Sequence, residues 1–202
     1  MDDPKLSYGR PKAIIWTAQS YHMQNPLPWY AIRLFSLHYQ EAIDFLAQQG
    51  LETFVPMESI TVRDHDGRLR HHQRPVVRNI IFVQKKYAVD EMRKIFASAA
   101  FKMAVYTKAS GSYEYYEIPA KEMFEFQVMC NLDKGDAMYC SESEVALKKG
   151  TPVIVEYGPL KGMTGKLVRA SKKYYLLKQI PGVAVMLKVT RWCCKPIVTG
   201  SQ

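Results

Sequence analysis

Apolar residues in the first part of the chain follow strand-like and helix-like patterns in turn. Residues 29–35 (WYAIRLF) are rich in aromatic and aliphatic side chains, which is typical of a strand. The next apolar positions recur at spacings of three and four, which predicts an amphipathic helix that Gly50 ends. These positions are Tyr39, Ala42, Ile43, Leu46 and Ala47.

Strand and helix patterns continue to about residue 130. Asp66-Gly67 is a hairpin-turn signal, and Pro119 precedes a helix, near the first turn where proline is tolerated. Strands and helices in this order predict an α+β fold, with an α/β sandwich in the N-terminal part. The remaining predicted strands cover residues 51–55, 76–83 and 101–106, and the remaining helices cover residues 89–100 and 120–130.

After Gly150 the pattern changes to short strands separated by turns. Five short strands within about fifty residues predict a small five-stranded β barrel. Residues 131–149 have few apolar positions, and residues 1–28 have scattered prolines and weak periodicity. We therefore expect an extension (1–28), an α+β domain (29–131), a linker (132–148) and a barrel (149–198).

Charge is distributed unevenly between these parts. The chain has a net charge of +9, but residues 148–202 alone hold 11 Lys/Arg and 1 Asp/Glu, a balance of +10. Residues 1–147 are then close to neutral, at −1. This asymmetry indicates a basic C-terminal module that meets a polyanion, and a merely solvated basic surface is the alternative.

Cysteine and hydropathy patterns limit the class of protein. None of the four cysteines belongs to a C-x-x-C pair, and the histidine cluster at 65–72 is distant from them in sequence. We therefore expect no metal or cofactor, and a monomeric, reduced, cytoplasmic protein with free thiols. The apolar runs are too short for a membrane span or a signal peptide, so we expect no membrane partner.

The segment YGPLKGMTGKL (157–167) tests whether the chain is an enzyme. A phosphate-binding loop needs a glycine where this chain has Leu160, and a Ser or Thr where it has Leu167. The glycines also lack the spacing of a dinucleotide-binding fingerprint. The chain shows no nucleophile elbow and no metal-ligand spacing either, so we expect no enzymatic activity.

The same glycines match a different pattern. The segment GTPVIVEYGPLKGMTGKLVRA (150–170) resembles a KOW motif, a Gly-Pro-containing element of small SH3-like β barrels. The matching residues are Val153, Val155, Gly158, Pro159, Leu160, Gly162 and Gly165.

Segments upstream extend the resemblance to a second module. WYAIRLFSLHYQEAIDFLAQQGLETFVP (29–56) resembles the opening of the NusG N-terminal (NGN) domain, and RPVVRNIIFV (74–83) resembles a later strand of it. IPAKEMFEFQVM (118–129) resembles a helix start in specialised NusG relatives of the UpxY type. The resemblance covers residues 28–197 in the family's order. It implies an NGN-like domain with an antiparallel sheet, followed by a KOW barrel.

This resemblance implies a transcription elongation and antitermination factor. Such a factor binds RNA polymerase through the NGN-like domain and recruits a partner through the KOW domain. The implied partners are non-template DNA, nascent RNA, Rho or a ribosomal protein, and UpxY-like relatives act on long operons such as those for surface (capsular) polysaccharides. The alternative is a ribosome- or RNA-associated KOW protein that acts in translation. Here Arg78-Asn79-Ile80 replaces the family's usual Pro-Gly-Tyr, which favours a specialised paralogue.

Candidate site residues follow from the matched segments. Apolar strand residues are candidates for polymerase contact, with core packing as the alternative, because strand alternation buries about half of them. Cations are candidates for nucleic acid, because arginine contacts phosphate and reads guanine. The polymerase candidates are Tyr30, Ile32, Val77, Ile80, Phe82 and Val105. The nucleic-acid candidates are Arg33, His38, Arg63, Arg68, Arg70, Arg74 and Arg78. The KOW partner or RNA candidates are Lys161, Lys166, Arg169, Lys172 and Lys173.

Overall fold

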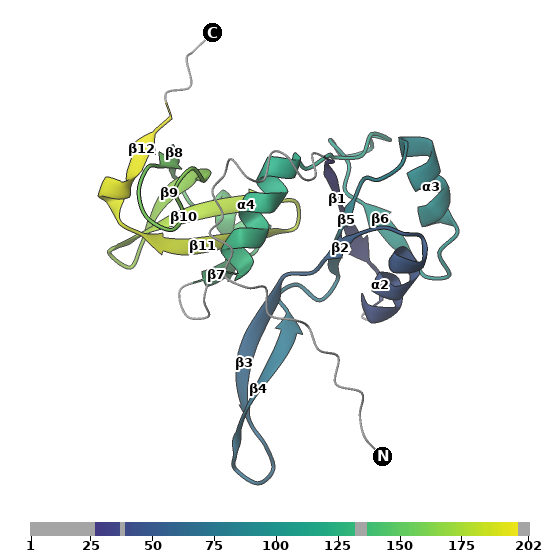
Figure 1. Ribbon diagram of the computed structural model, residues 1–202, viewed down its shortest axis with the longest axis horizontal. Coiled ribbons are helices and arrows are strands. Elements are labelled where there is room, and N and C mark those ends of the chain that lie inside the picture. Colours follow the sequence, from purple (N-terminus) through teal and green to yellow (C-terminus); the bar gives the residue numbers. More distant parts are fainter. Residues whose placement is uncertain (1–26, 37–38, 132–136, 198–202) are drawn as a thin grey trace.

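The computed structural model describes residues 27–36, 39–131 and 137–197 (Figure 1). The predicted extension lies almost wholly outside these residues, as does His38. The chain forms two sheet-containing units, with one helix, α4 (Ala120–Asn131), between them (Figure 1). The mixed helix and strand content and the antiparallel sheets confirm the α+β class.

The N-terminal unit is built on a four-stranded antiparallel sheet of order β2-β5-β1-β6. Helices α2 and α3 cover one face of this sheet and bury its apolar side chains. The strands are β1 (Trp29–Leu34), β2 (Thr53–Phe54), β5 (Ile80–Gln84) and β6 (Met103–Val105), and the helices are α2 (Tyr39–Gln48) and α3 (Val89–Ala97). These elements follow the predicted order, and their bounds differ from the predicted ones by a few residues.

A hairpin of two seven-residue strands, β3 (Met57–Arg63) and β4 (Leu69–Pro75), projects from this unit (Figure 1). The strands pair only with each other. At about 3.3 Å per residue, the hairpin reaches roughly 20 Å from the body of the molecule. Gly67 adopts a left-handed φ of 77° in the loop at the tip, which explains the glycine of the predicted turn.

The C-terminal unit is a six-stranded antiparallel sheet of order β12-β8-β9-β10-β11-β7. Among the described residues its strand ladders do not close into a barrel, so the predicted five-stranded barrel is not what the structure shows. The difference arises from residues 137–147, which form β7 and α5 where the sequence predicted a linker. The elements are β7 (Ala137–Cys140), α5 (Glu142–Ala146), β8 (Thr151–Val155), β9 (Thr164–Ala170), β10 (Lys173–Ile180), β11 (Val183–Val189), η1 (Arg191–Cys193) and β12 (Cys194–Pro196).

Candidate interaction surfaces

The two faces of the N-terminal sheet are both covered. Antiparallel pairing places Tyr30 opposite Val83 and Ile32 opposite Ile81, and these side chains pack under α2 and α3. The alternate residues, such as Phe82, point to the other face and join a second core with α4 and the C-terminal sheet. The described sheet therefore buries an apolar surface on each side.

This arrangement decides where the six polymerase candidates lie. Tyr30 and Ile32 are buried in the first core, and Ile80 and Phe82 are buried in the second. These four side chains pack internally and offer no surface to a partner in this structure. Val77 and Val105 are half-buried, so they are the members of the set that a partner could reach.

One end of the sheet carries exposed groups beside each other. Phe35 follows β1, is 67% exposed, and donates its backbone N–H to the carbonyl of Lys102. Arg78 is exposed in the neighbouring connection, where Asn79 accepts a hydrogen bond from the backbone of Leu34. The pattern missed Phe35, because a strand-terminal phenylalanine looks the same in sequence whether it is buried or exposed.

Arg33 is exposed next to this end and contacts the domain junction. Its Nη2 donates to the Tyr106 hydroxyl at 2.8 Å, and its guanidinium carbon lies 5.2 Å from the centroid of the same ring. Tyr106 thus holds Arg33 in place without neutralising its charge.

The four arginines of the β3–β4 hairpin fall into two classes. Arg70 pairs with Asp64 at 2.7 Å, and Arg74 pairs with Glu58 at 2.6 Å. Within the described residues, Arg63 and Arg68 make no ion pair. The hairpin therefore has two internally compensated arginines and two that are free for an anionic partner.

Asp64 organises the hairpin tip. One carboxylate oxygen accepts from the backbone N–H groups of Asp66 and Arg68 at 3.0 and 2.9 Å, and the other accepts from Arg70. The hydrogen bond from Arg70 and then that from the Arg68 backbone hold the pKa of Asp64 below its usual value. Asp64 therefore stays ionised and fixes both the turn and Arg70.

Helix α4 joins the two units through a continuous apolar core. Phe126 packs against Phe82 of the N-terminal sheet with ring centroids 5.8 Å apart, and Phe54 lies 6.3 Å from Phe126. On its other side, α4 packs against β10 and β11, whose Leu176 and Val185 belong to the same core. The two units thus pack against each other through one shared apolar core.

A buried charge network crosses this junction. Glu125 of α4 is 3% exposed, and its carboxylate lies 2.5 Å from the ammonium of Lys178, which is 7% exposed. Thr164 donates both its backbone N–H (3.2 Å) and its hydroxyl (2.9 Å) to the same carboxylate. This network could not be predicted from the sequence, because Glu125 is 39 positions from Thr164 and 53 positions from Lys178.

The β10–β11 turn completes the junction. Gly182 has a φ of 87°, and a Cβ placed there would lie 2.2 Å from Ile80 Cδ1 and 2.9 Å from the Tyr106 hydroxyl. A glycine is required because both the backbone conformation and the close approach exclude a side chain.

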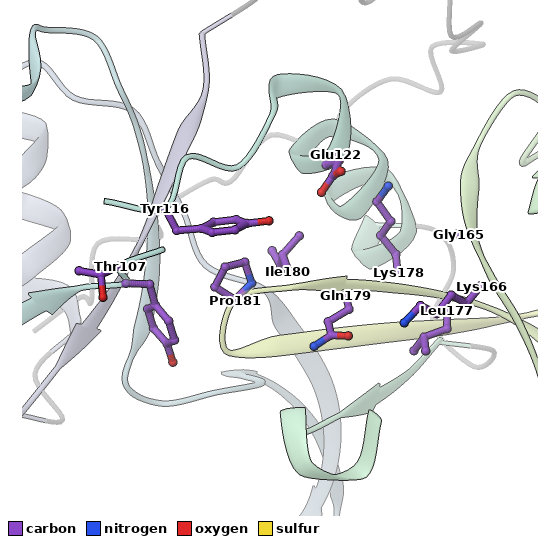
Figure 2. Close-up of a pocket in the computed structure, with 11 residues that line it drawn as sticks. Thr107, Tyr116, Glu122, Gly165, Lys166, Leu177, Lys178, Gln179, Ile180 and Pro181 are labelled. Carbon is purple, nitrogen blue, oxygen red and sulfur yellow. The ribbon is translucent and has the colours of Figure 1, made fainter. Parts of the chain in front are cut away.

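Beside this turn is an open cleft of about 500 Å³ between the two units. Tyr116 points into it from the N-terminal unit, toward Glu122 and Ile180 (Figure 2). On the C-terminal side, the cleft is lined by Lys166, Gln179 and Pro181. It is a solvent-filled edge of the junction, with mixed polar and apolar walls.

Comparison with known proteins gives the family of the N-terminal unit. Residues 27–127 match the family described as "NusG: Transcription termination factor nusG". The match covers half of the chain and runs from β1 into α4. The chain belongs to the NusG family. Among curated proteins, none matches the chain significantly.

Family membership identifies the chain as a NusG-type transcription factor. The NusG match includes the four-stranded sheet, the hairpin and Glu125, but it ends before the six-stranded sheet. The free arginines of the hairpin therefore belong to the NusG domain, and the basic C-terminal unit lies outside the matched region.

The C-terminal candidates do not form one cluster in this NusG-family protein. Lys166 lines the cleft at the junction, and Lys161 is exposed in the β8–β9 connection. At the other end of β9, Arg169, Lys172 and Lys173 are exposed around the β9–β10 turn. Sequence proximity grouped these five cations, but strand β9 separates them into two sets.

Cysteine thiols are the next chemically reactive groups in the described part of this NusG-family chain. Its four cysteines are free thiols, as predicted. Burial raises the pKa of the Cys130 thiol to about 12, with a small opposing effect of a hydrogen bond to Tyr139. No cluster of three or more metal-ligating side chains occurs in the described ranges. No helix found there is long and apolar enough to cross a membrane.

Proposed function

We propose that this NusG-type factor binds RNA polymerase through its N-terminal domain and supports elongation by opposing premature termination. The observation that carries the proposal is the family match over residues 27–127. The factor acts by binding, without catalysis, in the cytoplasm and as a monomer. The UpxY-like helix start at 118–129 supports action on particular long operons, such as those for surface polysaccharides.

The polymerase-facing surface is the exposed end of the N-terminal sheet. Phe35 is 67% exposed there, and Val77 and Val105 are partly accessible. Exposed apolar groups on a sheet whose two faces are already covered are suited to a protein partner. Arg78 adds a charge at the same end, where the family usually has Pro-Gly-Tyr.

Nucleic acid meets the factor through cations that have no internal carboxylate partner. Among the candidate arginines of the NusG domain, those without an ion pair to any described residue are Arg33, Arg63, Arg68 and Arg78. The hairpin projects away from the body (Figure 1), and Arg63 and Arg68 lie at its far end, at the end of β3 and just before β4. There they can reach the non-template DNA strand at the transcription bubble. Arg70 and Arg74 contribute less, because the carboxylates of Asp64 and Glu58 already offset part of their charge.

The C-terminal unit acts as a KOW-type module that holds a further partner. The Gly-Pro-Leu-x-Gly segment and the excess of 11 Lys/Arg over 1 Asp/Glu support this role. Nascent RNA is the partner that fits this charge excess best. Rho and a ribosomal protein are alternatives.

Co-purification tests the main proposal. A tagged chain should recover RNA polymerase from its native cells, and occupancy mapping should then place it on particular long operons. Phe35→Glu should lower polymerase recovery about tenfold, which corresponds to ~1.4 kcal/mol. Leu147→Glu is the matched control, because Leu147 is 86% exposed in the C-terminal unit. Recovery of ribosomes without polymerase would replace this proposal with a role in translation.

Salt dependence tests the hairpin. The double variant Arg63→Ala/Arg68→Ala should weaken binding to single-stranded DNA of a transcription bubble and lower the salt slope by about 1.4, at 0.7 per phosphate contact. Arg70→Ala/Arg74→Ala removes the same formal charge and is the matched comparison. Equal salt slopes for the two doubles would show that internal pairing does not decide which arginines bind.

A further inference from the structure

Two large aromatic side chains face solvent on the C-terminal unit. Trp192, in η1, is 72% exposed, and Tyr157, after β8, is 57% exposed. Their ring centroids are 6.1 Å apart with the planes inclined at 37°. Single exposed aromatics are common, but two in contact form a larger apolar patch, which marks a candidate interaction site.

Arginines continue this surface on one side. Arg191 directly precedes Trp192, and its guanidinium carbon lies 5.9 Å from the centroid of Tyr174. Arg169 lies 5.8 Å from the centroid of the same ring. The sequence and these contacts define two groups, one of Tyr157 with Trp192 and one of Arg169 and Arg191 with Tyr174, which adjoin where Arg191 and Trp192 are consecutive in η1. We name these five residues the aromatic–arginine strip.

The charge around the strip is positive and uncompensated. Glu156 is the one carboxylate between residues 148 and 202, and it pairs with Lys195 at 3.4 Å. Within the described residues, neither Arg169 nor Arg191 has an ion-pair partner. The strip therefore lies in a part of the chain with a strong excess of positive charge, which attracts an anion.

Exposed flat rings beside arginines fit one class of polyanion best. Bases of a single strand stack on aromatic side chains, while the cations contact the phosphates. A duplex would keep its base faces covered, and an acidic peptide would use the cations but not the rings. Because we propose a factor that travels with polymerase, the single strand it meets outside the enzyme is the transcript.

We propose that the aromatic–arginine strip is a binding site for single-stranded RNA, in which Tyr157 and Trp192 stack on bases and Arg169 and Arg191 contact phosphates. This inference rests on the proposed function for the choice of RNA over DNA. Of the five residues of the strip, only Arg169 was a candidate from the sequence. The structure adds Tyr157, Tyr174, Arg191 and Trp192.

The position of the strip leaves it accessible while the two units are packed together. Tyr174 is the second residue of β10, and Ile180, six residues later, ends β10 at the junction with the N-terminal sheet. These six steps correspond to about 20 Å. Figure 1 places η1, in yellow, at the end of the molecule away from that sheet. The strip and the exposed end of the N-terminal sheet can therefore be occupied at the same time.

Fluorescence anisotropy with the full chain and a labelled 12-nucleotide RNA without secondary structure tests the site. Trp192→Ala and Tyr157→Ala should each weaken binding about tenfold, and Trp192→Phe should retain most of the affinity. Arg169→Ala/Arg191→Ala should lower the salt slope by about 1.4. Tyr113→Ala, which removes a ring that is 88% exposed in the N-terminal unit, is the matched control.

Other probes separate the alternatives. Duplex RNA of the same sequence should bind more weakly than the single strand, because its base faces are covered. Unchanged RNA affinity in both Trp192→Ala and Tyr157→Ala would overturn the inference, as would tighter binding of the duplex. Loss of binding to polyglutamate, but not to RNA, in these variants would point to an acidic protein partner instead.

Polymerase recovery by the unmodified chain separates failure of this inference from failure of the proposed function. If the chain recovers polymerase but its RNA affinity does not depend on the strip residues, only the proposed RNA site is overturned. If its RNA affinity depends on the strip residues but the chain does not recover polymerase, only the elongation role is overturned.

Discussion

The domain junction and the β3–β4 hairpin both contain pairs of opposite charges, but the two regions use them differently. At the junction, Glu125 and Lys178 are withdrawn from water and satisfied by each other and by Thr164. On the hairpin, Arg74 and Glu58 pair in solvent. Removing one partner of a buried pair leaves an unpaired buried charge and lowers stability strongly, whereas an exposed pair contributes little to the free energy of unfolding. Similar residue pairs therefore support the fold in one region and tune a binding surface in the other.

Breaking the buried pair gives the largest expected effect. Lys178→Met leaves the buried Glu125 carboxylate with the Thr164 donors and with Lys121, whose half-exposed ammonium lies 3.9 Å away. This variant should lower the free energy of unfolding by about 3–5 kcal/mol in urea titration. Lys188→Met, at an exposed position of β11, is the control and should change stability by less than ~0.5 kcal/mol.

The double variant Glu125→Leu/Lys178→Met sharpens this prediction. Removing both charges should restore most of the stability that Lys178→Met loses, because no unpaired buried charge remains. A double variant as unstable as Lys178→Met would show that shape, and not charge, dominates at the junction.

Comparing two glycines with similar backbone conformations separates the cost of close packing at the junction from the cost of backbone strain. Gly182 has a φ of 87° and Gly158 a φ of 90°, but only Gly182 has neighbours within 4 Å of an added Cβ. Gly158→Ala should cost about 1–2 kcal/mol from backbone strain alone. Gly182→Ala should cost roughly a further 1–3 kcal/mol from overpacking against Ile80 and Tyr106. Equal thermal unfolding losses would contradict the close contact.

Alkaline pH tests burial near the junction. Burial raises the pKa of Cys130 from its ordinary value of 9.0 to about 12, so the folded protein keeps a proton that the unfolded chain releases. The free energy of unfolding should therefore be unaffected by this group below pH 9 and fall as pH rises from 9 toward 12. The expected slope is at most ~1.4 kcal/mol per pH unit. Urea titrations at pH 8 and pH 10, with Cys130→Ala as the control, measure it.

The exposed pairs of the hairpin give the smallest expected effect. Arg74→Ala should change the free energy of unfolding by less than about 1 kcal/mol, because the Arg74 and Glu58 side chains are 49% and 31% exposed. High salt should reduce this difference further. A loss as large as that of Lys178→Met would remove the contrast between the two regions.

Periodicity located most elements because their apolar faces are regular. The spacing of Ala42 and Leu46 predicted a helix, and both residues are buried in α2. The β9–β10 turn carried no signal, since Ser171 and Lys172 adopt left-handed φ values of 47° and 63° without a glycine or asparagine. Strand β7 was missed because four residues are too few to show a period.

The sequence predicted which types of surface the molecule carries, but it did not predict well which residues form them. Composition located the basic C-terminal unit, and strand alternation indicated that about half of the polymerase candidates would be buried. Pairing that depends on the fold could not be read from sequence, so Arg74 looked equivalent to Arg68. The solvent exposure of a single side chain could not be predicted from the sequence either, so Trp192 was not among the candidate residues.

The single core that runs through α4 couples the unfolding of the two units. A ligand that binds one end of a cooperative body raises the unfolding free energy of the whole by RT ln(1 + [L]/Kd), which is about 2.7 kcal/mol at a hundredfold excess over Kd. RNA on the aromatic–arginine strip would therefore protect amides of the distant N-terminal sheet from hydrogen exchange. Two domains joined only by a loose tether would show no such protection.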